Sequence, residues 1–314
     1  MTAAAFLGRP ASAPPARPCA VELSRRGGYD ALASIPPSFL SAAAPITTHI
    51  ILEFLRSLNP LYVLSGVLVG GLVGMTGVGG GSMMTPLLIL VFGVPPATAV
   101  GTDLIYAGFT NIGGALVHGT QRTVDWRIVV RLALGSVPAT ALMILLLYLL
   151  DVDSAVARSL ITKVLGLALL FTAVLLIFRK PIMRWHEANV GDLPPKTQAR
   201  LTTLTGALLG VLVTLSSVGA GAIGVTVLVM LYPKMLTRRI VGSDIAHAVP
   251  LAMLAGIGHS FLGAVDLRML TSLLAGSIPA IVVMSIVSAR ASDTAMRVAL
   301  AVVLIVVCIR FWFF

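Results

Sequence analysis

Charged side chains are scarce in this sequence, at 11% of 314 residues, whereas soluble domains carry about 25%. Aromatic residues make up only 6%. The two cysteines, Cys19 and Cys308, lie in unlike settings and lack the spacing of a metal site or a redox motif. What fills the chain is apolar, with 57% hydrophobic residues and a mean hydropathy of +1.00. This composition excludes a soluble domain and indicates that lipid surrounds most of the chain.

The apolar runs favour helices over a membrane barrel. Only these two structures satisfy every backbone hydrogen bond in lipid. The runs are long stretches of Leu, Val, Ile, Ala and Gly, not the alternating segments of about ten residues that build a barrel. We therefore expect an all-α integral membrane protein. The net charge of +10 indicates topology and not nucleic-acid binding, because Lys and Arg cluster between apolar runs without interleaved aromatic residues.

The chain divides into two membrane segments of similar length behind an N-terminal tail. We expect a disordered tail over residues 1–45, which are rich in Ala, Pro, Ser and Arg, and an interfacial amphipathic helix over 46–60. That this second stretch crosses the membrane remains an alternative. Residues 61–178 form the first membrane repeat, 179–200 a cytoplasmic loop and 201–314 the second repeat.

Each repeat holds five apolar segments. In the first they cover 61–78, 82–93, 100–118, 127–149 and 156–178. In the second they cover 201–216, 221–232, 241–260, 267–289 and 294–313.

The second repeat aligns on the first at a constant shift that grows by one residue near Lys234. Gly101-Thr102-Asp103-Leu104 falls on Gly242-Ser243-Asp244-Ile245, and Gly135-Ser136-Val137-Pro138 falls on Gly276-Ser277-Ile278-Pro279. One helical unit is therefore used twice. Further matched pairs are Gly66/Gly206, Gly70/Gly210, Gly79/Gly219, Gly81/Gly221, His118/His259 and Asp125/Asp266.

Charge indicates that the two repeats are inverted, because positive residues favour the cytoplasmic side of a membrane. The turn after the second segment is uncharged in the first repeat but carries Lys234, Arg238 and Arg239 in the second. A later turn is acidic in the first repeat, with Asp151 and Asp153, and basic in the second. Equivalent turns therefore face opposite sides, with the central loop in the cytoplasm.

The second segment of each repeat is too short to span the membrane. A dozen residues make a helix of about 18 Å, against a hydrocarbon core of about 30 Å. Such half-helices behind glycine loops, in corresponding positions of two inverted halves, indicate a transporter site near the bilayer midplane. Their free N–H groups and partial positive charge suit an anion.

We predict that the two loops and two matched hydroxyl residues bind the substrate. The alternative is that the glycines only permit close helix packing, which is the favoured interpretation for Gly66 and Gly70. The predicted ligands are Thr76, Gly77, Gly79, Gly80, Gly81, Ser82 and Thr102 in the first repeat, and Ser216, Ser217, Gly219, Gly221 and Ser243 in the second.

The first loop carries a family resemblance. Gly77-Val78-Gly79-Gly80-Gly81, followed by Thr85-Pro86 and then Ala99-Val100-Gly101-Thr102, resembles the TauE/SafE sulfite exporter (TSUP) transporters over about residues 61–314. The resemblance implies a permease of two repeats that moves sulfite or a small organosulfonate across the bacterial inner membrane. The sequence departs from the family pattern at one point: Asp103 follows Thr102 where a small hydroxyl residue is common, and Asp244 repeats the departure.

The two Asp residues are candidates for proton coupling. An ionised carboxylate inside a span costs several kcal/mol and is normally functional. Beside an anion it would repel the ligand unless protonated, and burial favours the protonated form. We expect Asp103 and Asp244 to couple transport to the proton gradient, with His247 one turn from Asp244 able to share its proton. The alternative is a structural carboxylate that caps neighbouring backbone.

Other matched residues have structural interpretations. Asp125 and Asp266 are expected to cap the helices that follow them, and Pro138 and Pro279 to kink the helices that contain them. His118 and His259 fall at the ends of spans, where an interfacial His is ordinary.

Secondary transport is the preferred function class. The sequence has no HExxH, GxSxG, Walker or Rossmann motif, so we do not expect an enzyme. An intramembrane aspartyl enzyme would place its two Asp residues in different motifs, whereas here they share one repeat position. A membrane chaperone or assembly factor remains the main alternative. We expect no cofactor and no metal. The expected partners are the anion, protons and the bilayer.

Overall fold

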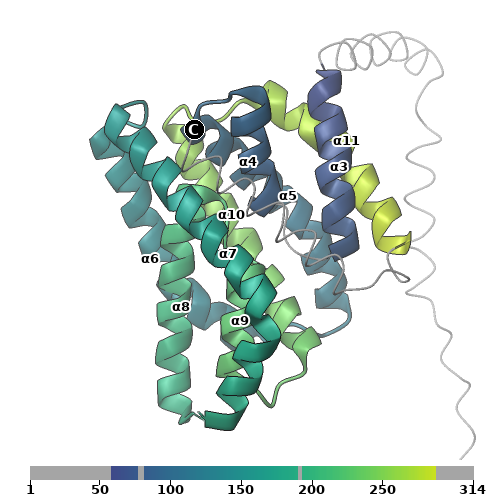
Figure 1. Ribbon diagram of the computed structural model, residues 1–314, viewed down its shortest axis with the longest axis vertical. Helices are drawn as coiled ribbons and strands as arrows, with labels where there is room; N and C mark the ends of the chain where they lie inside the picture. Colours follow the sequence, from purple (N-terminus) through teal and green to yellow (C-terminus); the bar gives the residue numbers. More distant parts are fainter. Residues whose placement is uncertain (1–57, 77–80, 190–192, 288–314) are drawn as a thin grey trace, which may run out of the picture. The chain divides into compact units, whose positions relative to one another are not determined.

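The computed structural model describes residues 58–76, 81–189 and 193–287, and every regular element in these ranges is an α-helix. The predicted all-α class is confirmed. The predicted tail, nearly all of the 46–60 helix and the segment at 294–313 lie outside the described residues. The helices are α3 (Pro60–Thr76), α4 (Gly81–Phe92), α5 (Pro96–Thr120), α6 (Trp126–Leu150), α7 (Ala155–Asn189), α8 (Pro195–Ser216), α9 (Ala222–Leu231), α10 (Thr237–Phe261) and α11 (Leu267–Val287) (Figure 1).

Five helices are long and apolar enough to cross a bilayer: α6, the part of α7 up to Leu175, α8, α10 and α11. The chain is therefore a multi-pass membrane protein. α5 is as long as α10 at 25 residues and carries Asp103 and Asn111. α4 and α9 have 12 and 10 residues, or roughly 15–18 Å of helix. Both short helices match the predicted half-helices.

The central polar stretch is more helical than predicted. α7 continues past the expected end at Phe178 to Asn189, and α8 begins at Pro195. The predicted loop at 179–200 is therefore mostly helix. The physical reason is that a span can end where charge begins while the helix continues: residues 179–189 contain several strong helix formers, and the helix runs through Pro181.

α9 folds back along α8 as a hairpin. The Tyr232 hydroxyl, just past the end of α9, lies 2.8 Å from Thr202 Oγ1 in the second turn of α8. At the other end of α9, a Cβ added to Gly224 would lie 3.3 Å from Leu209 Cδ1, well inside α8. The N-terminus of α9 is thus beside the middle of α8, and its C-terminus is near the start of α8.

α4 folds back along α3 in the same way. The rings of Tyr62 near the start of α3 and Phe92 at the end of α4 have centroids 4.7 Å apart. These two positions are equivalent by sequence to Thr202 and Tyr232. The repeat therefore extends from sequence to tertiary contacts.

Glycines join the first helix of each repeat to a helix of the other repeat. A Cβ added to Gly66 of α3 would lie 2.2 Å from the Leu273 carbonyl oxygen of α11, and one added to Gly206 of α8 would lie 2.1 Å from that of Leu132 in α6. Only glycine permits such backbone contact. The packing interpretation of the Gly66 row is confirmed, and the two repeats are interlocked, not side by side.

The equivalent helices α5 and α10 pack against each other in antiparallel orientation. Added Cβ atoms on Gly101, Gly108 and Gly114 of α5 would meet, in turn, Ala264 just after α10, Met253 and Ile245. As residue numbers rise on one helix they fall on the other. An inverted repeat requires this relation; the orientation of the repeats in the bilayer stays a prediction.

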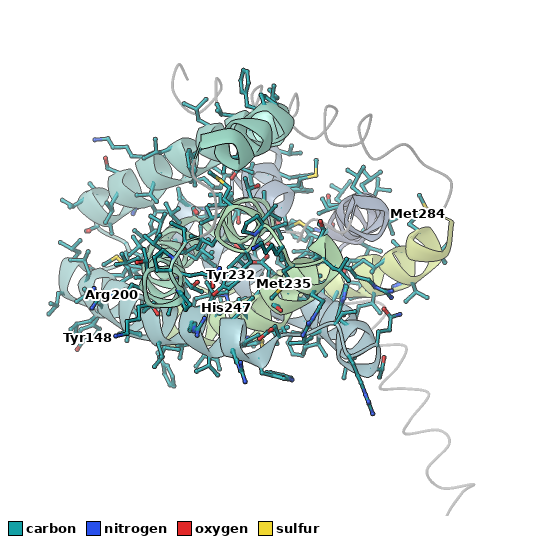
Figure 2. All side chains as sticks on the ribbon, turned by 90° about the horizontal axis from the view of Figure 1, so that it is seen from below. Tyr148, Arg200, Tyr232, Met235, His247 and Met284 are labelled. Carbon is teal, nitrogen blue, oxygen red and sulfur yellow. The ribbon has the colours of Figure 1, made fainter. Side chains whose placement is uncertain are left out.

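The α5–α6 turn and the α9–α10 turn lie at the same end of the helices. The Arg238 guanidinium donates to Gln121 Oε1, and Arg239 Nη2 lies 3.6 Å from Asp125 Oδ2. α8 also begins here, next to Tyr232. We call this end of the helices the basic end, and Figure 2 views the helices from it. The basic residues that it carries are Arg122, Arg127, Arg131, Lys196, Arg200, Lys234, Arg238 and Arg239.

Candidate functional site

The loop between α8 and α9 reverses the chain within five residues. Ser217 ends α8 with φ 58°, and Gly219 and Gly221 have φ of 125° and 96°, values that favour glycine. The Ser216 hydroxyl donates to the Leu212 carbonyl at 2.6 Å and accepts from the Val218 N–H at 3.2 Å. The predicted loop residues of the second repeat therefore lie together, with Ser216 holding the turn.

Asp244 reaches this loop from α10. Its Oδ2 accepts a hydrogen bond from the Gly221 N–H at 2.9 Å. Its Oδ1 lies where Gly224 leaves space, since a Cβ on Gly224 would be 2.1 Å away. The carboxyl is buried, at 1% exposure, and lies at the positive end of α9, where the helix dipole favours a negative group.

Asp103 makes a similar contact in the first repeat, one turn further into the half-helix. Its Oδ2 accepts from the Thr85 N–H at 3.1 Å and from the Thr85 hydroxyl at 2.5 Å. Thr85 lies near the start of α4, directly before Pro86. Each Asp therefore binds the N-terminal part of the half-helix in its own repeat, which is the contact of the structural alternative.

One carboxyl oxygen of each Asp is left over. Within the described part of the chain, Oδ1 of Asp103 and Oδ1 of Asp244 are buried and have no hydrogen-bond partner. An oxygen in this state can hold a proton without breaking the contact that Oδ2 makes. The two oxygens of each carboxyl therefore differ: Oδ2 accepts a hydrogen bond from the half-helix and Oδ1 does not.

The two repeats meet at Asp103. The Ser217 hydroxyl, in the loop of the second repeat, lies close to the Asp103 carboxyl of the first, although among the described residues it has no hydrogen bond of good geometry. A predicted loop ligand and a predicted coupling residue are thus brought together from opposite repeats.

Two matched polar pairs link the repeats further along α5 and α10. His247 Nε2 of α10 lies 2.8 Å from Ser136 Oγ of α6. At the equivalent positions, the Tyr106 hydroxyl of α5 lies near the Ser277 hydroxyl of α11. Sequence reasoning missed Thr85 and both serines as partners. The available signals were Thr85 beside Pro86 and a hydroxyl repeated at one position of two apolar helices.

Thr102 and Ser243 hold the starts of helices from the other repeat. Thr102 Oγ1 accepts from the Asp266 N–H at 3.0 Å, and Ser243 Oγ accepts from the Asp125 N–H at 2.8 Å. Both side chains are fully buried. These predicted substrate ligands are therefore engaged with backbone amides in this conformation.

The predicted caps are confirmed. Asp125 Oδ1 accepts from the Arg127 N–H at 3.0 Å, and Asp266 Oδ1 accepts from the Arg268 N–H at 2.9 Å.

His259 is not interfacial, so that prediction is wrong. It is fully buried, and its Nε2 lies 3.0 Å from the Thr214 carbonyl oxygen of α8. The reason is the glycine opposite it: a Cβ on Gly101 would lie 2.9 Å from His259 Cβ. His118 is half-buried, with Nδ1 2.8 Å from Thr123 Oγ1.

The first loop is defined only at its edges. Gly77, Gly79 and Gly80 lie outside the described residues. Thr76 ends α3, and Gly81 and Ser82 begin α4. Among the described residues, no group of three or more His, Cys, Asp or Glu side chains could hold a metal ion.

The protein has several spanning helices and two short helices that fold back. A buried carboxyl lies near the start of each short helix. Such paired broken helices in a multi-pass membrane protein are typical of secondary transporters. The family model of the sulfite exporter TauE/SafE family matches residues 62–311. The chain belongs to this family.

Similar proteins carry transporter names. The chain is 38% identical over 245 residues to the probable membrane transporter protein YjnA of Bacillus subtilis, covering 78% of this chain and 96% of that one. It is 28% identical to YdhB of the same organism, over 69% of this chain and 85% of that one. It is 26% identical to MJ0441 of Methanocaldococcus jannaschii, over 65% of this chain and 73% of that one. No solved structure matches the chain.

Proposed function

We propose that this membrane transporter moves a small anion, such as sulfite or an organosulfonate, across the bacterial inner membrane in exchange with or together with protons. The observation that carries the proposal is that a buried Asp at the same repeat position contacts the N-terminal part of each half-helix. The family description supports a sulfur oxyanion as the substrate.

The contacts suggest how an anion and a proton are linked. While Asp244 is ionised, it occupies the positive end of α9 through the Gly221 N–H and repels an incoming anion. Protonation at Oδ1 removes this charge while Oδ2 keeps the Gly221 N–H, so the positive end of the α9 dipole can attract the anion. The anion therefore binds best when Asp244 is protonated, and Asp103 with Thr85 follows the same rule at α4.

His247 supplies an asymmetric element. It lies one turn from Asp244 on α10, with Nε2 on Ser136 and Nδ1 without a partner in the described part of the chain. We assign it to sharing a proton with Asp244. Tyr106 stands at the equivalent position and titrates far above neutral pH in its ordinary state, so the relay belongs to the second repeat.

Flux in inside-out vesicles tests the proposal. Sulfite, thiosulfate, sulfoacetate, taurine and simple carboxylates are offered with and without an imposed proton gradient. We expect at least one anion to move faster with the gradient, and both Asp103→Asn and Asp244→Asn to remove that dependence. Asp153→Asn, in an exposed turn, is the control and should behave as wild type.

Two results would contradict the proposal. Wild-type flux that ignores the gradient would exclude proton coupling. Absence of flux for every anion tested, in vesicles that contain folded protein, would favour the chaperone or assembly alternative.

A further inference from the structure

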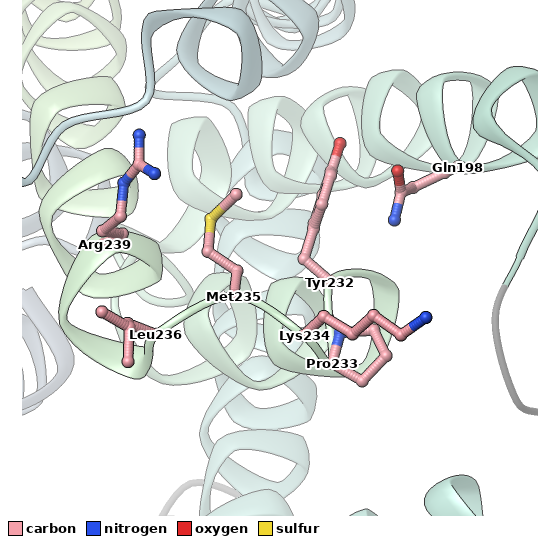
Figure 3. Close-up of a pocket in the computed structure, with 7 residues that line it drawn as sticks. All are labelled: Gln198, Tyr232, Pro233, Lys234, Met235, Leu236 and Arg239. Carbon is pink, nitrogen blue, oxygen red and sulfur yellow. The ribbon is translucent and has the colours of Figure 1, made fainter.

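A polar pocket lies at the basic end. It has a volume of about 350 Å³ and is formed by the α9–α10 turn, the start of α10 and the first turn of α8 (Figure 3). It is separate from the carboxyl contacts at the half-helix N-termini, because it adjoins the C-terminus of α9. Its lining residues are Gln198, Tyr232, Pro233, Lys234, Met235, Leu236 and Arg239.

Hydrogen bonds fix two polar residues that line the pocket. The Tyr232 hydroxyl contacts Thr202 Oγ1 at 2.8 Å and accepts from Arg131 Nη1 at 3.2 Å. Gln198 Nε2 donates to the Leu231 carbonyl at 2.5 Å. These contacts tie α6, α8 and α9 together around the cavity, so it does not need to form when a ligand binds.

The pocket is suited to an anion. Lys234 and Arg239 line it, and the carboxylate that Arg239 meets, Asp125, is 3.6 Å away. α10 starts at this point with Leu236 as its N-cap and no side-chain cap. The start of α10 adds a partial positive charge near the cavity.

The other wall is apolar and open to the surroundings. Leu236 is 74% exposed, and Met235 and Pro233 lie beside it in the lining. Together with Met235 and Pro233, Leu236 gives the pocket an apolar edge beside two cations, which fits the boundary between headgroups and acyl chains. This combination distinguishes a lipid from a free anion as the occupant.

The repeat does not impose this chemistry. The equivalent turn of the first repeat, Gly93-Val94-Pro95, has no charged residue. Since both repeats share the same helical unit, the unit itself does not require cations in this turn. Lys234 and Arg239 are specific to the turn of the second repeat.

We infer that this pocket binds the phosphate of an anionic phospholipid in the leaflet at the basic end, with an acyl chain against Leu236. The inference goes beyond the proposed transport function and concerns a different site. Basic pockets between membrane helices on the cytoplasmic side commonly take such headgroups. A bound lipid would bridge α8 and α10 at the end where α9 returns.

Lipid titration of the purified full chain in neutral detergent tests the inference. Phosphatidylglycerol, phosphatidylcholine and inorganic phosphate are each added while retained lipid is counted by native mass spectrometry and the melting temperature is followed. We expect phosphatidylglycerol alone to be retained and to raise the melting temperature. Losing two cations in Lys234→Gln/Arg239→Gln should weaken its apparent affinity by about tenfold or more.

The control variant Arg127→Gln/Arg200→Gln removes the same charge from exposed positions of the same end that do not line the pocket. It should bind as wild type. The single variant Lys234→Gln keeps the Arg239–Asp125 contact. It tests the pocket if the double variant does not fold. Equal losses in the pocket and control variants would overturn the inference, leaving the cations as topology signals. A response to inorganic phosphate that matches the response to the lipid would also overturn it.

Discussion

Gly101 lies at one of the tightest contacts between the two repeats. A Cβ there would be 2.0 Å from the Ala264 carbonyl oxygen and 2.9 Å from His259 Cβ. Backbone cannot give way as a flexible side chain can, so the helices would have to separate. The residue following it in the sequence, Thr102, holds the Asp266 N–H, and that bond would be strained as well.

We therefore expect Gly101→Ala to destabilise the protein by about 1–3 kcal/mol, as overpacking of a dense core does. The thermal melting temperature in detergent measures it. Gly113→Ala in the same helix is the matched control, because its Cβ meets nothing within 4 Å. That change should be neutral or stabilising by up to about 1 kcal/mol, since alanine is the better helix former. Equal melting temperatures for the two variants would refute the packing argument.

For the two Asp residues, the sequence predicted a shared role but not their hydrogen-bond partners. Their matched positions predicted a matched role, and the structure gives both a contact at a half-helix. Their partners were not predictable, since Thr85 and Gly221 are chosen by the angle at which α4 and α9 return. Whether the same residues also carry protons is a question for the flux experiment.

At the level of elements, the half-helix α9 depends on one small residue. Gly224 lies in its first turn and faces Asp244 Oδ1, which a Cβ would approach to 2.1 Å. The carboxyl would have to rotate and release the Gly221 N–H.

We expect Gly224→Ala to lower anion flux at least about tenfold, the loss that corresponds to roughly 1.4 kcal/mol, and to weaken its dependence on the proton gradient. Flux in vesicles and the melting temperature are measured on the same preparation. Gly119→Ala, with open space around its Cβ, serves as the control. Normal flux in Gly224→Ala would show that the Asp244 contact is dispensable.

Element lengths were predictable where they conflict with the bilayer. A run of a dozen apolar residues cannot span the membrane, so α4 and α9 were expected as half-helices. The end of α7 was not predictable, because hydropathy marks where a segment leaves lipid and not where its hydrogen bonds stop. The interfacial prediction for His259 failed for a related reason: sequence placed it near a helix end, and packing against α8 buried it.

For the whole molecule, the arrangement of α5 and α10 determines which turns share a side. The α5–α6 and α9–α10 turns meet through Arg238 and Gln121, and the α10–α11 turn meets the start of α5 through Asp266 and Thr102. Thr120 and Phe261 are equivalent positions that end α5 and α10. They must therefore emerge at opposite ends of the bundle.

We expect single cysteines at these positions to react from opposite sides of the membrane. In a background with Cys19 and Cys308 replaced by serine, an impermeant maleimide on intact cells should label Phe261→Cys and not Thr120→Cys. Permeabilised cells should give labelling of both and serve as the control. Labelling of both in intact cells, or of Thr120→Cys alone, would contradict the predicted topology.

The sequence by itself determined that lipid surrounds most of the chain, that the fold is helical, that one unit is repeated and that each repeat contains a half-helix. Each of these follows from local properties: composition, run length and residue identity at a constant shift. Only the tertiary structure decided that Gly66 and Gly206 pack across the repeats, and that the Thr102 and Ser243 hydroxyls hold backbone from the opposite half. The physical reason is that these contacts depend on the direction in which distant helices cross. Hydrophobic pattern within one segment carries no information on that direction.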